Sequence, residues 1–245
     1  MIKEFIAKHK TDAWILFYFG VITFIYSLCA SSFIQLYAIQ IMFPQFNLGE
    51  GIAVFDSAGF NLIAKKKAME INGGGWQFWE LRPSGTLNGY VTAGQSPAGI
   101  ASIFYTLWEP KPYAMLPFNA IVNALSGCMV VWLLRCFYPL LPCIMGGALF
   151  IMNPMAMEWV SQIHRDGIFI LGNLMVLVSL FHLLKILNNV KVNNMLWAPI
   201  LGLSGTSLTW VARPYWVQVL FVTILLWLFA LVILCAFTGK CSNEK

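Results

Sequence analysis

The sequence predicts an all-α integral membrane protein, a polytopic bundle of about six transmembrane helices. Hydrophobic residues make up 59% of its 245 residues, and only 10% are charged. Soluble domains carry roughly 25% charged residues, so this chain has too few to cover a water-facing surface. Aromatic residues reach 15%, including 10 Trp, which suits a protein anchored at both interfaces of a bilayer.

The candidate spans are apolar runs, because crossing a hydrocarbon core takes roughly 20 residues. They cover residues 14–34, 113–137, 140–152, 167–187, 196–211 and 214–237. The fifth run contains Gly202, Gly205 and several hydroxyl residues, which favours a place inside the bundle. Residues 1–245 are therefore expected to form a single transmembrane module.

The distribution of Lys and Arg predicts that both termini lie in the cytoplasm. Lys3, Lys8 and Lys10 precede the first span, and an even number of crossings returns the C-terminus to the same side. The short outer loops then keep only Arg165 and Arg213. A bacterial inner membrane is the expected location.

Composition also argues against two other classes of protein. The net charge of +5 does not indicate nucleic-acid binding, because the basic residues form no stripe with interleaved aromatics. The 6 Cys include no pair at CxxC spacing and none in the predicted outer segments. A disulfide framework or a zinc site is therefore not expected.

A long extracytoplasmic loop, residues 42–112, is predicted to carry amphipathic helices. Within residues 57–71, one helical face collects Phe60, Ile63, Ala64, Ala68 and Ile71. That pattern is typical of a helix lying at the membrane surface. The stretch Asn72-Gly73-Gly74-Gly75 should end this helix, and Ser96-Pro97 should open a second, short one over 98–108.

Two acidic residues stand beside apolar sequence at the outer membrane boundary, Asp56 in VFDSAGF and Asp166 in HRDGIFI. An ionisable residue at such a boundary indicates a functional site. Both positions also have a purely structural explanation. Asp56 precedes the amphipathic helix as an N-cap would, and Asp166 stands where a carboxylate favours the N-terminus of the fourth span.

Basic residues in the outer loops are candidates for binding an anionic group. Arg213, in WVARPYW, has the planar fork that matches a phosphate. The alternative is an Arg that extends to the interface between two Trp residues. His164 and Arg165 adjoin Asp166 and either assist it or anchor the end of the span.

The order of these features resembles the transmembrane module of the GT-C class of glycosyltransferases, over residues 14–237. That class includes protein O-mannosyltransferases, the lipid A aminoarabinose transferase and oligosaccharyltransferase. The matching pieces, in order, are an outer loop with Asp56, the Gly-rich stretch, the Ser-Pro helix, a span FNAIVNALSGCMVVWLLR, and GLSGTSLTWVARPYW. The pattern L-x-x-x-x-R-P, from Leu208 to Pro214, is the most persuasive of them.

The resemblance implies that Asp56 is the catalytic base of an inverting sugar transfer from a polyprenyl-phosphate donor. It implies that Arg213 neutralises the leaving phosphate, with His164 and Arg165 beside the donor. Asp166 matches the acid that in some members binds a divalent metal ion and in others orients the donor; no other cofactor is implied. The implied partners are the lipid-linked sugar and membrane lipids, with no nucleic acid.

The chain departs from the class in two respects. Many relatives have an Asp-Glu pair in the first loop, whereas Ser57 follows Asp56 here. Relatives also usually have further spans and a C-terminal extracytoplasmic domain, so a second chain supplying those elements is a further expected partner.

Two other functions remain open at this level. A non-catalytic membrane subunit, such as a partner of a lipid-linked-sugar flippase or polymerase, would carry the same composition. A small transporter is less favoured, because no predicted span has a charged residue near its middle and no inverted repeat is present.

Overall fold

The computed structural model describes residues 2–83, 85–87, 90–92, 96–188 and 197–238. The described chain is almost entirely helical, which confirms the predicted all-α class. The helices are α1 (Ile2–Phe33), η1 (Ile34–Met42), η2 (Pro44–Phe46), α2 (Phe55–Gly74), η3 (Trp76–Phe78), α3 (Ser96–Leu107), η4 (Pro112–Met115), α4 (Leu116–Leu134), α5 (Leu140–Ile151), α6 (Pro154–Val160), α7 (Asp166–Asn188), α8 (Trp197–Ala212) and α9 (Pro214–Thr238). Strands β1 (Gly85–Leu87) and β2 (Tyr90–Thr92) pair antiparallel in the segment between η3 and α3.

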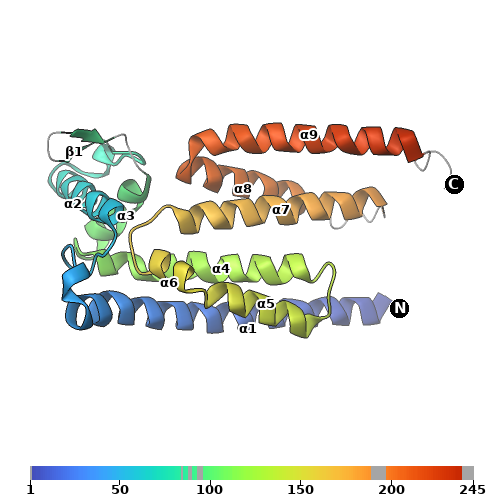
Figure 1. The fold of residues 1–245 in the computed structure, drawn as a ribbon, viewed down its shortest axis with the longest axis horizontal. Coiled ribbons are helices and arrows are strands. Elements are labelled where there is room, and N and C mark those ends of the chain that lie inside the picture. Colours follow the sequence, from blue (N-terminus) through green and yellow to red (C-terminus); the bar gives the residue numbers. More distant parts are fainter. Residues whose placement is uncertain (1, 84, 88–89, 93–95, 189–196, 239–245) are drawn as a thin grey trace.

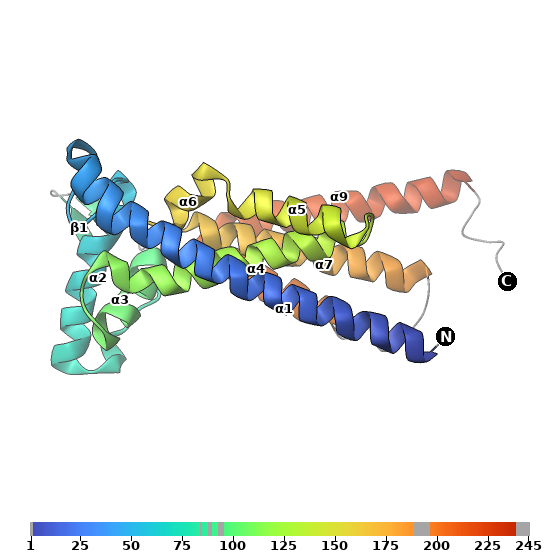
Figure 2. The same ribbon diagram turned by 90° about the horizontal axis from the view of Figure 1, so that it is seen from below.

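The long helices run back and forth along one axis (Figure 1). The continuous α1 and η1 cross from one end to the other, α4 returns, α5 and α6 cross again, and α7, α8 and α9 continue the alternation. Helices α2 and α3 gather at the end away from the start of α1 and the end of α9. Helix α2 lies across the long axis there (Figure 2).

Three helical segments of the described chain are long and apolar enough to cross a membrane: Ala13–Met42, Pro112–Leu134 and Asp166–Leu184. The pair Leu140–Ile151 and Pro154–Val160, bent by 59° at Asn153-Pro154, makes a fourth if it counts as one broken span. The chain is thus an integral membrane protein with three to four candidate spans.

The sequence predicts six spans, whereas the described residues supply three to four candidates. The fifth predicted run became α8, which has 16 residues and is shorter than a typical span. The sixth became α9, with 25 residues. The third run, 140–152, is only the first arm of the bent pair, because Pro154 has no backbone N–H to continue the helix.

Helices α7 and α8 are in direct backbone contact at their glycines, whereas Ile200, Leu203 and Trp210 on α8 are exposed, so the helix packs by one face and is not internal as predicted. A methyl group built on Gly205 would lie 2.6 Å from the Gly172 carbonyl oxygen, and one on Gly172 would lie 2.6 Å from Thr209 Oγ1. Farther along, the Ser179 hydroxyl donates a 2.6 Å hydrogen bond to the Ala198 carbonyl. Small residues thus let the two helices approach closely. Close packing is what holds helices together in a membrane, because lipid supplies no hydrophobic driving force for their association.

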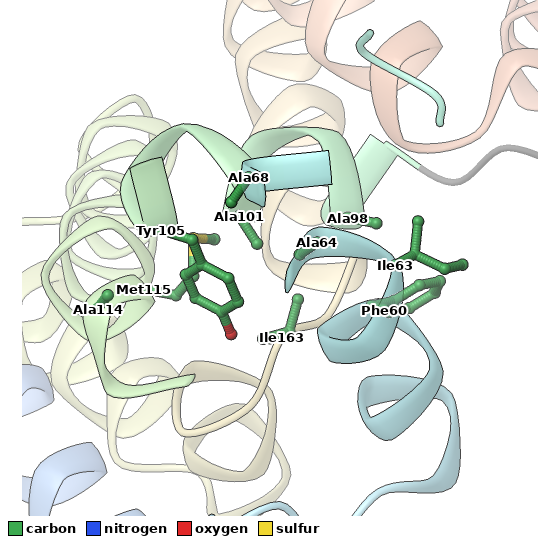
Figure 3. Packing of buried hydrophobic residues seen from close by; sticks show 10 residues of the cluster. All are labelled: Phe60, Ile63, Ala64, Ala68, Ala98, Ala101, Tyr105, Ala114, Met115 and Ile163. Atoms are coloured by element: carbon green, nitrogen blue, oxygen red, sulfur yellow. The ribbon is translucent and has the colours of Figure 1, made fainter. Parts of the chain in front are cut away.

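Helix α2 contains the predicted amphipathic segment, but its apolar face is not a membrane surface. Phe60, Ile63, Ala64 and Ala68 are buried in a cluster with Ala98, Ala101 and Tyr105 of α3, Ala114 and Met115 of η4, and Ile163 (Figure 3). Ile71 is also buried. The prediction that this face lies on the membrane is therefore wrong, because α3 and the segment before α7 offer apolar surface inside the protein.

The contact between α7 and α8 predicts that Gly205→Leu destabilises the protein by about 1–3 kcal/mol, the usual cost of overpacking. The added side chain meets the α7 backbone, which has no room to move aside. Thermal unfolding in detergent measures the effect. Gly73→Ala is the control, because a methyl group there meets nothing within 4 Å. Equal melting temperatures for the two variants would contradict the contact.

Candidate functional site

An ion pair joins the start of α7 to the junction of α8 and α9. Arg213 Nη2 donates to Asp166 Oδ1 at 2.5 Å, and the two side chains are 26% and 19% exposed. Asp166 is the first residue of α7, and Arg213 lies between the end of α8 at Ala212 and Pro214 of α9. The structure therefore brings together two residues that the sequence singled out separately.

The Arg213 guanidinium is held in place but keeps hydrogen-bonding capacity. It lies 4.7 Å from the centre of the Phe169 ring, which in turn packs edge-on against Trp216 at 5.4 Å. Within the described chain its Nε–H is buried and has no hydrogen-bond partner. The side chain as a whole is 26% exposed, so a guanidinium with one N–H on a carboxylate keeps donors for an anionic oxygen.

His164 lies beside this ion pair. The Asp166 backbone N–H donates to His164 Nδ1 at 3.2 Å, and the same nitrogen is 3.4 Å from Asp166 Oδ2. Burial lowers the pKa of His164, the carboxylates of Asp166 and Asp56 raise it, and the positive charges of Arg165 and Arg213 lower it. Since Nδ1 accepts a hydrogen bond, the ring is assigned as neutral with its proton on Nε2.

Asp56 is exposed and close enough to His164 for its charge to act on that ring. It is the second residue of α2; the N-cap is Val54, which makes no side-chain capping bond. The N-cap interpretation of Asp56 is therefore wrong. Its carboxylate makes no hydrogen bond or ion pair with another described residue, yet it is near enough to raise the pKa of His164.

Buried amides that the sequence analysis did not single out fix the two outer segments against each other. Gln162 accepts from the Ala53 N–H at 3.1 Å and donates to the Gly51 carbonyl at 3.2 Å. Gln35 of η1 donates to the Ser161 carbonyl at 2.9 Å. These bonds place the start of α2 opposite the segment 161–165. The sequence signal that could have indicated Gln35 and Gln162 is their place as polar residues near the ends of apolar runs.

Gly51 is required for this junction. Its φ is +80°, and a methyl group there would lie 2.2 Å from the Gln35 carbonyl oxygen. Asn119 of α4 completes the anchor, since its amide donates to the Val160 and Gln162 carbonyls at 3.1 and 2.8 Å. Two elements of candidate spans, η1 and α4, and the loop before α2 thus hold the segment that carries His164 and Arg165.

The described residues do not assemble a metal site: they contain no group of three or more His, Cys, Asp or Glu able to hold an ion. Of the carboxylate oxygens of Asp166, one is bonded to Arg213 and the other faces His164. The four cysteines with described side chains, Cys29, Cys128, Cys136 and Cys143, are free thiols, as predicted. No family model, no curated protein and no solved structure matches this chain.

The lowered pKa of His164 predicts a pH dependence of stability. The unfolded imidazole has a pKa near 6.5 and takes up a proton more readily than the folded one, so the folded state loses stability as pH falls from about 6.5. The melting temperature should fall across this range in the wild type and fall less in His164→Asn. Parallel curves for the two proteins would show that His164 is not buried as described.

Proposed function

We propose that this chain is a membrane glycosyltransferase of the GT-C type, which moves a sugar from a polyprenyl-phosphate donor to an acceptor on the extracytoplasmic face. The observation that carries the proposal is the exposed Asp56 carboxylate beside His164 and the Asp166–Arg213 pair, at one end of a bundle of membrane-spanning helices. This end of the bundle therefore holds both an unpaired base and anion-binding groups.

Asp56 is the general base of the proposed reaction. Its carboxylate takes the proton from an acceptor hydroxyl or amine while the acceptor atom bonds to the anomeric carbon. The bond from that carbon to the phosphate oxygen breaks, and its electron pair leaves with the polyprenyl phosphate. This single displacement inverts the anomeric configuration. Base catalysis of this kind contributes about 10²–10⁴-fold to rate.

Arg213 binds the phosphate as it gains charge. Its side chain is 26% exposed, so the guanidinium can reach a ligand, and a charge-assisted hydrogen bond is strong where most water is excluded. The assigned Nε2–H of His164 is a second donor, and Arg165 adds positive charge in the same segment. Together these groups favour the leaving phosphate over the intact donor.

Asp166 orients Arg213 in this proposal. The 2.5 Å bond to Arg213 occupies the carboxylate oxygen that a divalent ion would use, so a metal would have to displace the guanidinium. The structure thus favours the donor-orienting role of this acid over the metal-binding role. Both roles are known in the class that the sequence resembles.

The proposal includes six crossings, both termini in the cytoplasm and a bacterial inner membrane. The alternating direction of α1, α4, α5 with α6, α7, α8 and α9 supports this topology (Figure 1). It places Asp56, Asp166 and Arg213 outside and the start of α1 inside. Membrane lipids and the polyprenyl-linked sugar are then the immediate partners.

A non-catalytic membrane subunit is the second candidate. None of the α9 residues whose side chains are described is buried, so this helix has a face for lipid or for another chain. In that case substitution of Asp56 would alter assembly with a partner and leave transfer by the complex unchanged.

The test is native mass spectrometry of the purified protein together with release of polyprenyl phosphate in native membrane extract. Asp56→Asn should retain the lipid-linked donor and slow the release by about 10²–10⁴-fold, the usual contribution of a general base. Arg213→Ala should lose the bound lipid phosphate. The matched control is Glu70→Gln, which removes an exposed carboxylate of the same helix that pairs with Lys67.

Release at the wild-type rate by Asp56→Asn would exclude Asp56 as the base and favour the subunit function. Retention of lipid phosphate by Arg213→Ala would exclude Arg213 as the phosphate ligand.

A further inference from the structure

A cavity of about 250 Å³ lies inside the bundle, next to the candidate site. Its walls are α4, the arms of the bent pair α5 and α6, and the first turns of α7. Polar and aromatic lining residues include Asn119, Asn123, Ser126, Asn153, Trp159 and His164. His164 belongs to both the cavity wall and the site, so the two spaces adjoin.

The α4 wall of the cavity is polar along one stripe. Asn119, Asn123 and Ser126 are spaced four and three residues apart and therefore share one helical face. They belong to a helix that is apolar enough to span the membrane. Polar side chains in such a helix are costly unless they have partners, and they commonly mark a functional site.

The amides of this stripe present hydrogen-bond acceptors to the cavity. Asn119 uses its N–H groups on the Val160 and Gln162 carbonyls. Asn123, only 7% exposed, donates to the Ser27 hydroxyl at 2.9 Å. Neither side-chain carbonyl has a partner among the described residues, and both residues line the cavity. His164, the proposed second donor to the phosphate, lines the end of the cavity nearest the site.

These groups define the kind of ligand that fits. The lining contains no Asp, Glu, Lys or Arg, so the bound group is uncharged. A hydrocarbon chain in the cavity would cover these two carbonyls and leave them unpaired, whereas hydroxyl groups satisfy them. Drug-sized ligands take pockets of roughly 300–1,000 Å³, so this smaller cavity suits a single ring. The Trp159 indole adds an aromatic surface for it.

We infer that this cavity is the recognition pocket for one uncharged sugar ring of the donor, with the Asn119 and Asn123 carbonyls accepting hydrogen bonds from its hydroxyls. The inference rests on the proposed function, because it places the ring beside the phosphate-binding groups. It makes Asn119 and Asn123 determinants of which sugar is transferred. Asp56, which lies outside the cavity lining, has no part in ring recognition.

Saturation-transfer NMR of the protein in lipid nanodiscs tests this inference, with methyl glycosides of neutral hexoses, N-acetylhexosamines and pentoses as probes. At least one glycoside should bind the wild type. Asn123→Leu removes an acceptor and should weaken that binding roughly tenfold. Ala156→Leu fills the cavity without removing a polar group and should weaken glycoside binding as much. This second variant keeps the test decisive if Asn123→Leu fails to fold.

One control should bind the glycoside as the wild type does. Gln218→Leu makes a similar change on the exposed surface of α9. The inference is overturned if no glycoside of the panel binds the wild type, or if Asn123→Leu and Ala156→Leu bind it unchanged.

The test of the sugar pocket and the test of the proposed function can fail independently of each other. Glycoside binding that is lost in Asn123→Leu, combined with lipid phosphate that stays bound in Arg213→Ala, would support the pocket and reject the phosphate site. Loss of lipid phosphate in Arg213→Ala, with no glycoside binding to the wild type, would support the phosphate site and reject the pocket.

Discussion

The backbones of α7 and α8 touch at Gly172 and Gly205, and this contact determines where Asp166 and Arg213 meet. Asp166 begins α7 and Arg213 follows α8, so two helices in close contact bring these residues to the same end. Their ion pair is only partly exposed, so it is stronger than one in water. Removing one partner of a fully buried pair costs about 3–5 kcal/mol, and the cost at this exposure is smaller. The helix contact and the ion pair therefore support each other.

A second constraint connects this pair to the proposed base. Gln162 binds the backbone at Gly51 and Ala53, and Gln35 and Asn119 bind the backbone carbonyls of residues 160–162. Gln35 and Asn119 belong to η1 and α4, and Gln162 bridges the two outer segments. These bonds together fix the position of the start of α2 relative to His164. Supporting bonds of this kind keep functional groups in their working geometry. The same Asn119 reaches the cavity, so one residue belongs to both the anchor and the proposed sugar pocket.

Sequence patterns predicted the parts of this arrangement that depend on local composition. Apolar runs located the helices, and Gly202 and Gly205 indicated a close helix contact, which α8 makes with α7. Acidic and basic residues at run ends identified Asp166 and Arg213, although only the fold shows that they pair. The partners of Gln35 and Gln162 lie more than 100 residues away, so no local pattern predicts them. The buried face of α2 was misassigned for the same reason: periodicity shows that a face is apolar but not whether lipid or α3 covers it.

A charge-exchange cycle at Asp166 and Arg213 tests the central claim that this ion pair organises the site. Asp166→Arg and Arg213→Asp each place two like charges together, so each should lower the melting temperature. Arg213→Asp should also release bound lipid phosphate, because it removes the guanidinium that binds it. The double variant restores opposite charges and should recover much of the lost stability, because the two effects are coupled. It should not fully recover lipid binding, since the guanidinium is then on α7. Additive losses in the double variant would show that the residues do not interact and would contradict this account.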